Sequence, residues 1–241
     1  MLRIVILHTI IFMKIKRENI LYYNAIANEY NEMLDTIPDK IVRNKVADKF
    51  CSVVKDGVVL DFGGGTGLDI QWLTNKNFTV FFCEPSTGMR ERAISAYSNL
   101  PQDKIIFLDD SAMDFRQWHL QLPFPVQVDA VLSNFAVLNC IHDIELLFQN
   151  LALVIKPGAD IIALVLTKRL KKKLNGNFRD IIKSFIHSGP AILNLRYKKY
   201  GQTVYVYSIE EIIKASAKHF IFCSSEVLLA SGFTLIHLKC R

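Results

Sequence analysis

The sequence predicts an α/β fold in which helices cover both faces of a mostly parallel sheet. Short apolar runs alternate along the chain with longer segments of helical periodicity, as in proteins built from repeated strand–helix units. In addition, the apolar run 58–62 leads directly into four glycines within five residues. That arrangement is typical of a buried strand that turns sharply into a helix.

Length and composition fit one large domain. The 241 residues suffice for a sizeable core, and 51% apolar with 22% charged residues is the composition of an ordinary soluble globular protein. The net charge of +6 favours anionic partners without selecting one class. The five cysteines are odd in number and lack metal-binding spacing, so they predict no disulfide framework, no metal site and a reducing cytoplasm.

Residues 1–17 are predicted to form an apolar and basic N-terminal extension. Their apolar run superficially resembles a signal sequence, but it has no small-residue cleavage site and is too short to span a bilayer as a helix. We therefore expect a cytoplasmic protein without membrane attachment, in which residues 18–241 form a single domain. Met13 is an alternative start of the folded region.

The elements of residues 18–166 follow from periodicity and from turn residues. Apolar spacing predicts two N-terminal helices over 18–50, separated by Pro38, which we expect to lie over the ligand site as a lid. Strands are predicted at 58–62, 78–83, 105–108, 128–132 and 161–166, and helices at 68–75, 87–98 and 144–154. Ser86 or Thr87 is the expected N-cap of the second of these helices and Asp143 that of the third. Lys156, Pro157 and Gly158 are expected to end the third helix.

Residues 167–202 interrupt this rhythm and are predicted to be an insertion or lid over the edge of the sheet. They begin with a basic run at 168–173, and 178–187 has helical spacing. The last part of the chain is predicted to contain a strand at 203–207, a helix at 209–220 and a closing strand at 234–238. Residues 221–231 fit either a strand with a turn or another helix.

The glycine cluster after the first strand predicts a ligand site. Glycine adopts positive φ at little cost and lets a ligand approach the main chain closely, and the helix behind it presents unpaired N–H groups. Polar residues also follow the other predicted strands, at Glu84, Asp110, Ser133 and Asn134. Because the carboxyl ends of parallel strands share one edge, these residues are expected to meet there. A turn that only packs a helix on the sheet is the alternative.

The spacing of the glycines separates two nucleotide-like ligands. A dinucleotide fingerprint requires G-x-G-x-x-G, whereas here Leu68 occupies the third glycine's place. The segment 60–67, LDFGGGTG, resembles instead the first motif of the class I S-adenosylmethionine-dependent methyltransferases. This resemblance covers about residues 20–166. It implies S-adenosylmethionine as cofactor and a Rossmann-like, doubly wound, mostly parallel seven-stranded sheet with an antiparallel C-terminal strand.

The same resemblance implies the roles of individual residues. The amino-acid end of the cofactor would be surrounded by Asp61, Gly63, Gly64, Gly65 and Gly67. Glu84 would hold both ribose hydroxyls, since a carboxylate accepts from two donors at once. The adenine would be lined by Asp110, Ser111 and Ala112, with Asp109 as an alternative acidic contact. Further expected contacts are Pro85, Asn134, Phe135, Tyr23 and Tyr30, the tyrosines having core packing as the alternative.

Methyl transfer from a sulfonium needs mainly alignment of the reactants and exclusion of water. An acceptor hydroxyl would also need a base, for which His142 is the candidate; the alternative is a solvated loop residue or a contact at the helix start beside Asp143. Cys140 is a candidate pocket residue, with simple packing as the alternative.

The predicted function is S-adenosylmethionine-dependent methyl transfer to a small-molecule acceptor. An RNA methyltransferase is an alternative because of the basic run 168–173. That run has no interleaved aromatic residues, and 133–136 lacks the Asn-Pro-Pro-aromatic signature of nucleic-acid amino methyltransferases. A second alternative is a protein that binds the cofactor without turnover. The sequence predicts no oligomeric state.

Overall fold

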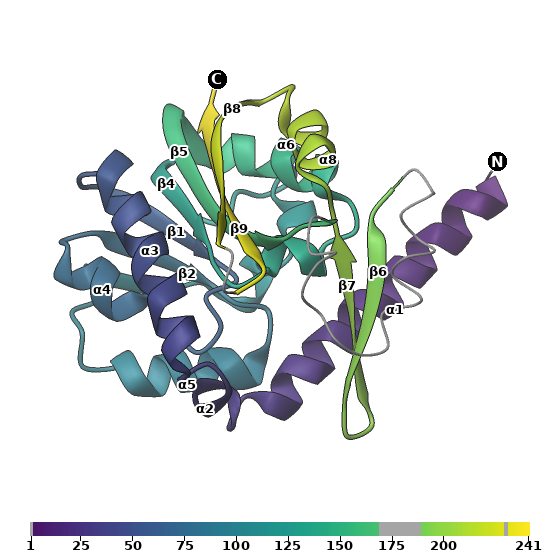
Figure 1. Cartoon of the computed structure of the whole chain (residues 1–241), viewed down its shortest axis with the longest axis horizontal. Coiled ribbons are helices and arrows are strands. Elements are labelled where there is room, and N and C mark those ends of the chain that lie inside the picture. The colour runs from purple at the N-terminus through teal and green to yellow at the C-terminus, as the bar shows by residue number, and fades with distance from the viewer. Residues whose placement is uncertain (1, 169–188, 229–230) are drawn as a thin grey trace.

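The computed structural model describes residues 2–168, 189–228 and 231–241, and for residues 2–13 it describes the backbone alone. Within these residues a seven-stranded sheet lies between two layers of helices (Figure 1). The strand order is β3-β2-β1-β4-β5-β9-β8, in which β9 runs antiparallel to both neighbours and the first five run parallel. The predicted α/β class, with its antiparallel C-terminal strand, is therefore confirmed. The strands are β1 (Val58–Phe62), β2 (Thr79–Cys83), β3 (Ile105–Phe107), β4 (Val128–Ser133), β5 (Ile155–Leu166), β8 (Phe220–Leu228) and β9 (Phe233–Cys240).

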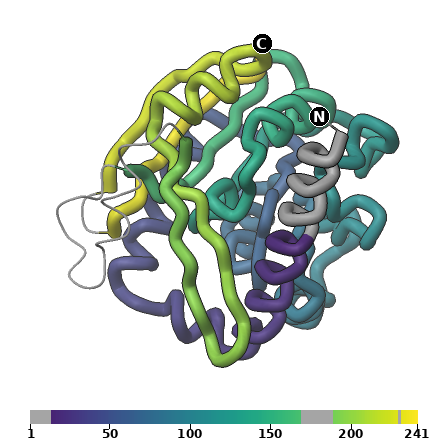
Figure 2. Tube along the Cα trace, turned by 90° about the vertical axis from the view of Figure 1, so that its right-hand side faces the viewer, coloured from purple at the N-terminus to yellow at the C-terminus, as the bar shows by residue number. Residues whose placement is uncertain are grey.

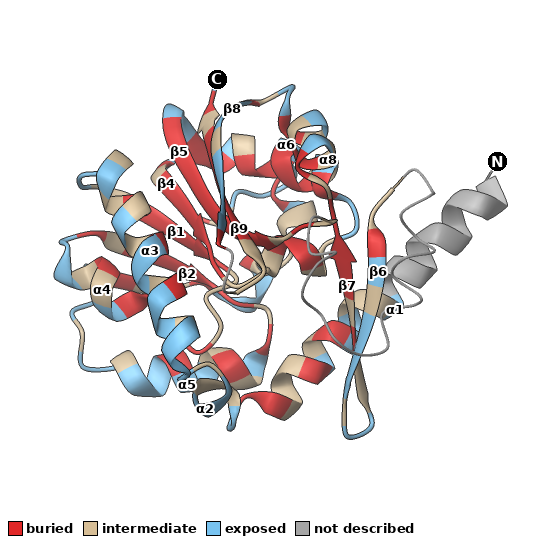
Figure 3. Cartoon of the chain, viewed as in Figure 1, coloured by how far each residue is buried: buried red, intermediate tan, exposed pale blue. Residues whose placement is uncertain are grey.

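One face of the sheet is covered by α3 (Ile37–Val53), α4 (Ile70–Asn75) and α5 (Thr87–Tyr97). The other face is covered by α6 (Ile144–Val154) and α8 (Ile209–Ser216). Leu60 and Phe62 of β1 contribute to the core on the α6 side, whereas Val59 contributes to the core on the α3 side. Because side chains alternate between two covered faces, the central strands are mostly apolar and largely buried (Figure 3).

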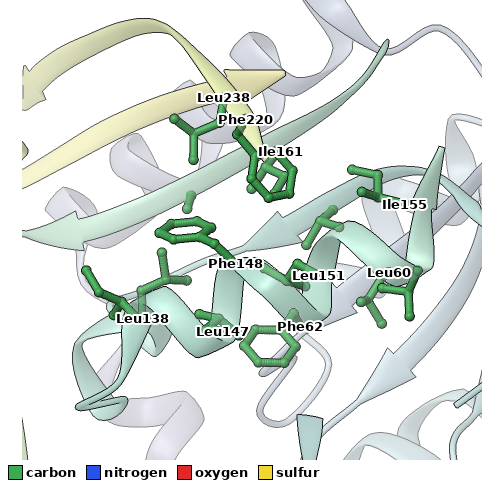
Figure 4. Packing of buried hydrophobic residues seen from close by; sticks show 14 of the residues in the cluster. Leu60, Phe62, Leu138, Leu147, Phe148, Leu151, Ile155, Ile161, Phe220 and Leu238 are labelled. Atoms are coloured by element: carbon green, nitrogen blue, oxygen red, sulfur yellow. The ribbon is translucent and has the colours of Figure 1, made fainter. Parts of the chain in front are cut away.

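Helix α6 shows how the core on that side is packed. Leu147, Phe148 and Leu151 point from the helix toward the sheet, where Phe62 of β1 and Phe220 of β8 lie (Figure 4). Each of these three helical side chains is at most 1% exposed. Leu151 follows Phe148 by three residues and Leu147 by four, which places all three on one face, as expected for an amphipathic helix against a sheet.

Outside the sheet, helix α1 (Leu2–Ile26) runs alongside an antiparallel hairpin of β6 (Ala191–Tyr197) and β7 (Tyr200–Val206). Figure 2 views the molecule from the side of this hairpin, which stands in front of the main sheet. Asn19 joins the two elements: its Nδ2 donates to the carbonyl oxygen of Thr203 at 3.1 Å, and its Oδ1 accepts from the amide of Thr203 at 2.8 Å. A short helix, α2 (Tyr30–Met33), follows α1.

The predicted N-caps agree with the structure. Ser86 accepts a hydrogen bond from the amide of Met89 at the start of α5, and Asp143 accepts one from the amide of Leu146 at the start of α6. Each cap satisfies one of the amides that have no partner within the helix.

Several predicted boundaries are wrong. Helix α6 ends at Val154 as predicted, but residues 156–158 belong to β5, which begins at Ile155, and do not form a separate turn that caps the helix. Gly158, at φ +77°, lies where the register between β4 and β5 shifts. The first helix begins at Leu2 rather than near residue 18, and Pro38 stands in the first turn of α3 instead of between two helices. The helix predicted at 209–220 ends at Ser216, and Phe220 already belongs to β8. This strand resolves the ambiguity for 221–228, whereas 229–230 lie outside the described residues.

The predicted insertion at 167–202 is described in part. It contains β6 and the start of β7, whereas 169–188, with most of the basic run and the helix predicted at 178–187, lie outside the described residues. The domain boundaries and the lid roles stay predictions. In the described part of the chain, none of the helices is long and apolar enough for a membrane crossing. The expected cytoplasmic location stays a prediction.

Candidate functional site

A cavity of about 360 Å³ lies beyond the carboxyl ends of β1, β2 and β4. Its walls come from α1, from the loops that follow these strands, from residues 113–116 and from Tyr205 of β7. Chain order reverses between β1 and β4, which is the place where open parallel sheets bind ligands. The cavity is therefore the candidate site.

The structure brings about half of the predicted site residues into this cavity. Those that line it are Tyr23, Tyr30, Gly63, Gly65, Glu84, Pro85, Phe135 and His142. Those that lie outside its lining are Asp61, Gly64, Gly67, Asp110, Ser111, Ala112 and Asn134. The role of each of these residues in cofactor binding stays a prediction. The residues that line the cavity and those outside its lining have different surroundings.

The glycines of the loop differ in their surroundings: some leave room for a ligand, and others leave room for neighbouring side chains. Gly63 and Gly65 have φ of +77° and +60° and line the cavity. A Cβ added to Gly65 would meet only Cε1 of Tyr30, at 3.6 Å, so this glycine faces open space. A Cβ added to Gly64 would lie 2.2 Å from the ring of Phe82, and one at Gly67 would lie 2.6 Å from the Ile70 side chain. A Cβ added to Gly63 would lie 2.4 Å from the Val137 side chain, so packing accounts for Gly63, Gly64 and Gly67. Gly65 alone of these four glycines faces open space.

Glu84 is held by the main chain at the cavity wall. Its Oε2 accepts from the amide of Gly65 at 2.9 Å, and its Oε1 accepts from the amide of Ser86 at 2.7 Å. Burial raises the pKa of Glu84 to about 7, although the amides of Ser86 and Gly65 and the charge of Arg90 favour ionisation. Each carboxylate oxygen keeps a further lone pair for a ligand hydroxyl.

Asp61 lies behind the glycine loop and is 1% exposed. Its Oδ2 has no hydrogen-bond partner among the described residues. Burial raises the pKa of this carboxyl, Asp69 raises it further, and Arg43 opposes both. A buried oxygen without a partner is costly, so this atom is suited to a donor that arrives from outside the protein.

Arg43, Asp69 and Asn134 form a buried network beside the loop. Asp69 Oδ2 lies 2.8 Å from the Arg43 guanidinium and accepts from Asn134 Nδ2 at 3.0 Å. The same guanidinium lies 4.5 Å from the ring centre of Phe135. Phe135 and Ala136 both have left-handed backbone conformations, with φ of +48° and +65°. Asn134 is thus turned away from the cavity while Phe135 lines it, and strained residues of this kind cluster at functional sites.

Tyr23 and Tyr30 reach the cavity from the N-terminal segment, and their rings meet edge to face with centroids 6.3 Å apart. The hydroxyl of Tyr23 accepts from Gln202 Nε2 at 2.7 Å and lies 3.6 Å from the Cys140 sulfur. Burial raises the pKa of both phenols, so both are neutral at physiological pH. Cys140 lines the cavity as well.

Asp110, Ser111 and Ala112 form a short turn beside the cavity. Asp109 caps the turn by accepting from the amides of Ser111 and Ala112, and Asp110 pairs at the surface with Arg90. The cavity is lined instead by the next four residues, Met113 to Arg116. The sequence interpretation missed these residues, although the apolar Met113 and Phe115 directly after the polar turn indicate a buried wall.

His142 lines the cavity, and its ring meets that of Tyr205 edge to face at 5.0 Å. The Tyr207 hydroxyl donates to the carbonyl oxygens of Ile141 and His142, at 2.6 and 2.7 Å. His142 is exposed and directly precedes Asp143, the N-cap of α6, so it lies both at the cavity wall and beside the helix start. Its role as a base stays a prediction.

Helix α1 contributes Tyr23, which was predicted, and four further residues that the sequence interpretation missed. Ile15, Lys16, Asn19 and Ile20 line the cavity, because the hairpin holds α1 across it. Lys16 lies 2.9 Å from Asp114, which also accepts two hydrogen bonds from Arg116, at 2.8 and 2.9 Å. Burial opposes ionisation of Asp114, but these two cations outweigh it and lower its pKa to about 2. Among the described residues no His, Cys, Asp and Glu side chains group as a metal site would require.

Comparison with known proteins places these features in context. Residues 60–163 match the family model described as a methyltransferase domain. An uncharacterized methyltransferase of Geobacillus sp. (strain WCH70) is 35% identical over 109 residues, which are 45% of this chain and 43% of that protein. The match thus spans less than half the length of that relative.

Solved structures share the fold over most of the chain. DhpI, in its complex with SAH, has a TM-score of 0.65 and 16% identity, covering 94% of this chain and 97% of that one. A S-adenosylmethionine-dependent methyltransferase from Clostridium acetobutylicum has a TM-score of 0.60 and 15% identity, covering 88% and 98%. The 1,6-didemethyltoxoflavin-N1-methyltransferase of Burkholderia thailandensis has a TM-score of 0.63 and 13% identity, covering 92% and 88%.

Proposed function

We propose that the chain is a class I S-adenosylmethionine-dependent methyltransferase that transfers a methyl group from S-adenosylmethionine to a small-molecule acceptor; the match of residues 60–163 to a methyltransferase domain and the shared fold support this proposal. The observation that carries the proposal is the pairing of Glu84 with Gly65 at the cavity wall. A carboxylate that is held by two amides can still accept hydrogen bonds from a ribose diol. The open glycine beside it lets the neighbouring part of the ligand approach the main chain closely.

The residues at the site fit this cofactor. Glu84 would hold the ribose hydroxyls, the backbone at Gly63 and Gly65 would lie along the amino-acid part, and Met113 and Phe115 offer apolar surface for a base. Three carboxylates, Glu84, Asp114 and Asp143, line the cavity against two cations, Lys16 and Arg116. This balance suits a ligand that carries a positive sulfonium.

When bound, S-adenosylmethionine supplies an activated methyl group on a sulfonium with a good leaving group. The protein's task is then to align the acceptor and to exclude water. Helix α1 and the aromatic side chains of Tyr23, Tyr30 and Phe135 close the cavity and serve both purposes. For a hydroxyl acceptor we propose that His142 takes the proton, since its ring lines the same cavity.

Two observations support a small-molecule acceptor. The cavity volume of about 360 Å³ is near the lower end of the range for small-molecule sites, so an acceptor that shares it with the cofactor has to be small. The two cations of its wall are paired with Asp114, which leaves neither of them for a phosphate. The Burkholderia thailandensis protein named above was solved with a small heterocycle, 1,6-didemethyltoxoflavin, and with S-adenosylhomocysteine.

Calorimetry with S-adenosylmethionine and with NAD tests the cofactor. We expect binding of the former, and weakening by about tenfold or more in Glu84→Ala, because a charge-assisted pair of hydrogen bonds is lost. Glu226→Ala, which changes an exposed carboxylate of β8, is the matched control and should leave the affinity unchanged. Preferential binding of NAD would contradict the proposal. Methylation of RNA by the loaded enzyme would favour the alternative acceptor class.

A further inference from the structure

Given the proposed methyl transfer, on which this step rests, we infer that the acceptor is flat and carries no negative charge, such as an aromatic ring with a hydroxyl or an amino group. The inference comes from the part of the cavity wall that α1, α6 and β7 contribute, at a distance in the chain from the glycine loop. Its charges, its apolar surface and its aromatic rings each restrict the acceptor.

The charged side chains of the cavity wall already have partners inside the protein. Asp114 holds both Lys16 and Arg116, as described above. Both oxygens of Glu84 accept from backbone amides, and Asp143 accepts from the amide of Leu146 at 3.0 Å. Both cations are thus already paired, and an anionic acceptor would have to break one of these ion pairs or be desolvated without a counter-charge. An uncharged acceptor meets neither cost.

Apart from Asn19, whose side chain is held by Thr203, the remaining described residues of this wall are mainly apolar or aromatic. They include Ile15, Ile20, Ile141, Leu146, His142 and Tyr205. The rings of His142 and Tyr205 stand nearly perpendicular, with an interplanar angle of 79°. Two perpendicular rings beside branched aliphatic side chains offer both a face and an edge to a third ring, which is the arrangement that aromatic ligands prefer.

The chemistry of such an acceptor balances without a further reactant. The lone pair of its oxygen or nitrogen forms the new bond to the methyl carbon, and the electron pair of the broken carbon–sulfur bond stays on sulfur. The proton of the acceptor O–H or N–H passes to His142 and then to solvent. A phenol or an aromatic amine supplies both the lone pair and the proton.

A pair of probes with the same rings and different charge tests the inference. The protein saturated with S-adenosylhomocysteine is titrated with 2-naphthol and with 2-naphthoate by calorimetry at neutral pH. We expect 2-naphthol to bind about tenfold more tightly or better, because only the carboxylate must be desolvated. Tyr205→Ala should weaken 2-naphthol by about fivefold or more, Tyr205→Phe should restore it, and both should leave the affinity for S-adenosylhomocysteine unchanged.

Asp114→Asn is the complementary variant, since it frees Lys16 and Arg116 at the wall. It should improve binding of 2-naphthoate by about tenfold, whereas Glu226→Gln, at an exposed surface pair, should not change it. Binding of 2-naphthoate as tight as that of 2-naphthol, or no binding of either probe, would overturn the inference while cofactor binding stands. Failure to bind S-adenosylhomocysteine would instead overturn the proposed function.

Discussion

The carboxylate of Glu84, at the end of β2, accepts a hydrogen bond from the amide of Gly65, in the loop after β1, at 2.9 Å. One side chain thus joins the two loops that form the proposed cofactor site. Because the second oxygen is held by the amide of Ser86, the carboxylate has one defined orientation before any ligand arrives. Preorganisation of this kind lowers the entropy cost of binding.

Glu84 is expected to make the stability of the cofactor-free protein depend on pH. Its folded pKa of about 7 is above the ordinary value of 4.5, because burial disfavours the charged form. Protonation of Glu84 therefore stabilises the folded state fully below the ordinary pKa of 4.5, and this stabilisation is lost as the pH rises through about 7. Between about pH 5 and about pH 8 the free energy of unfolding should fall by about 1–3 kcal/mol, measured by urea unfolding.

Glu84→Gln should remove most of this fall, since an amide does not titrate. Asp61, whose pKa is also raised, remains in the variant and accounts for any residual slope. A variant with the full slope of the parent protein would show that Glu84 does not titrate in this range.

Gly65→Ala should weaken binding of S-adenosylhomocysteine by about tenfold or more, because its Cβ would stand in the cavity. Gly158→Ala is the matched control: Gly158 has φ of +77°, has no atom within 4 Å of an added Cβ and lies in β5 away from the cavity. Both variants should lose about 1–2 kcal/mol of stability from positive φ. Calorimetry should separate them, and equal loss of affinity would contradict the cavity-facing role of Gly65.

Arg43→Ala should destabilise the fold by about 3–5 kcal/mol, because it leaves the buried carboxylate of Asp69 without its cation. Lys45→Ala, on the same helix, removes an exposed pair with Glu226 and should cost about 0–1 kcal/mol. Denaturant unfolding of both variants provides the measurement. Comparable small losses would mean that the contacts of Asp69 with Trp72 and Asn134 suffice to hold it.

Asn19→Ala should release α1 from β7, since it leaves the amide and the carbonyl of Thr203 unpaired, at a cost of about 1–3 kcal/mol. Faster hydrogen exchange in residues 14–26 and in β7 would report the release. Asn194→Ala is the control, because the exposed Asn194 contacts only the Thr203 hydroxyl. Unchanged exchange in Asn19→Ala would show that apolar contacts alone hold the helix.

Local patterns predicted most of the sheet and its helices. The bounds of β1 and α6 agree with the prediction at both ends, because an apolar run before glycines and a capped amphipathic segment are signals contained within a few residues. The strand predicted at 203–207 overlaps β7, but β6 and its pairing with β7 were not foreseen, since the hairpin packs against α1, nearly two hundred residues earlier in the chain.

The candidate site shows the same division. Gly65 and Glu84 follow their strands directly, and parallel strands bring such residues to one edge, so the sequence by itself determined this half of the site. Only the tertiary structure decided whether Asn134 or Phe135 faces the cavity. Phe135 and Ala136 have left-handed backbone conformations, and Asn134 donates a hydrogen bond to Asp69. The tertiary structure also decided the wall formed by Lys16, Asp114 and Tyr205. These residues come from three segments that are far apart in the sequence. Contacts between them form only when the chain packs, so a pattern of neighbouring residues does not predict them.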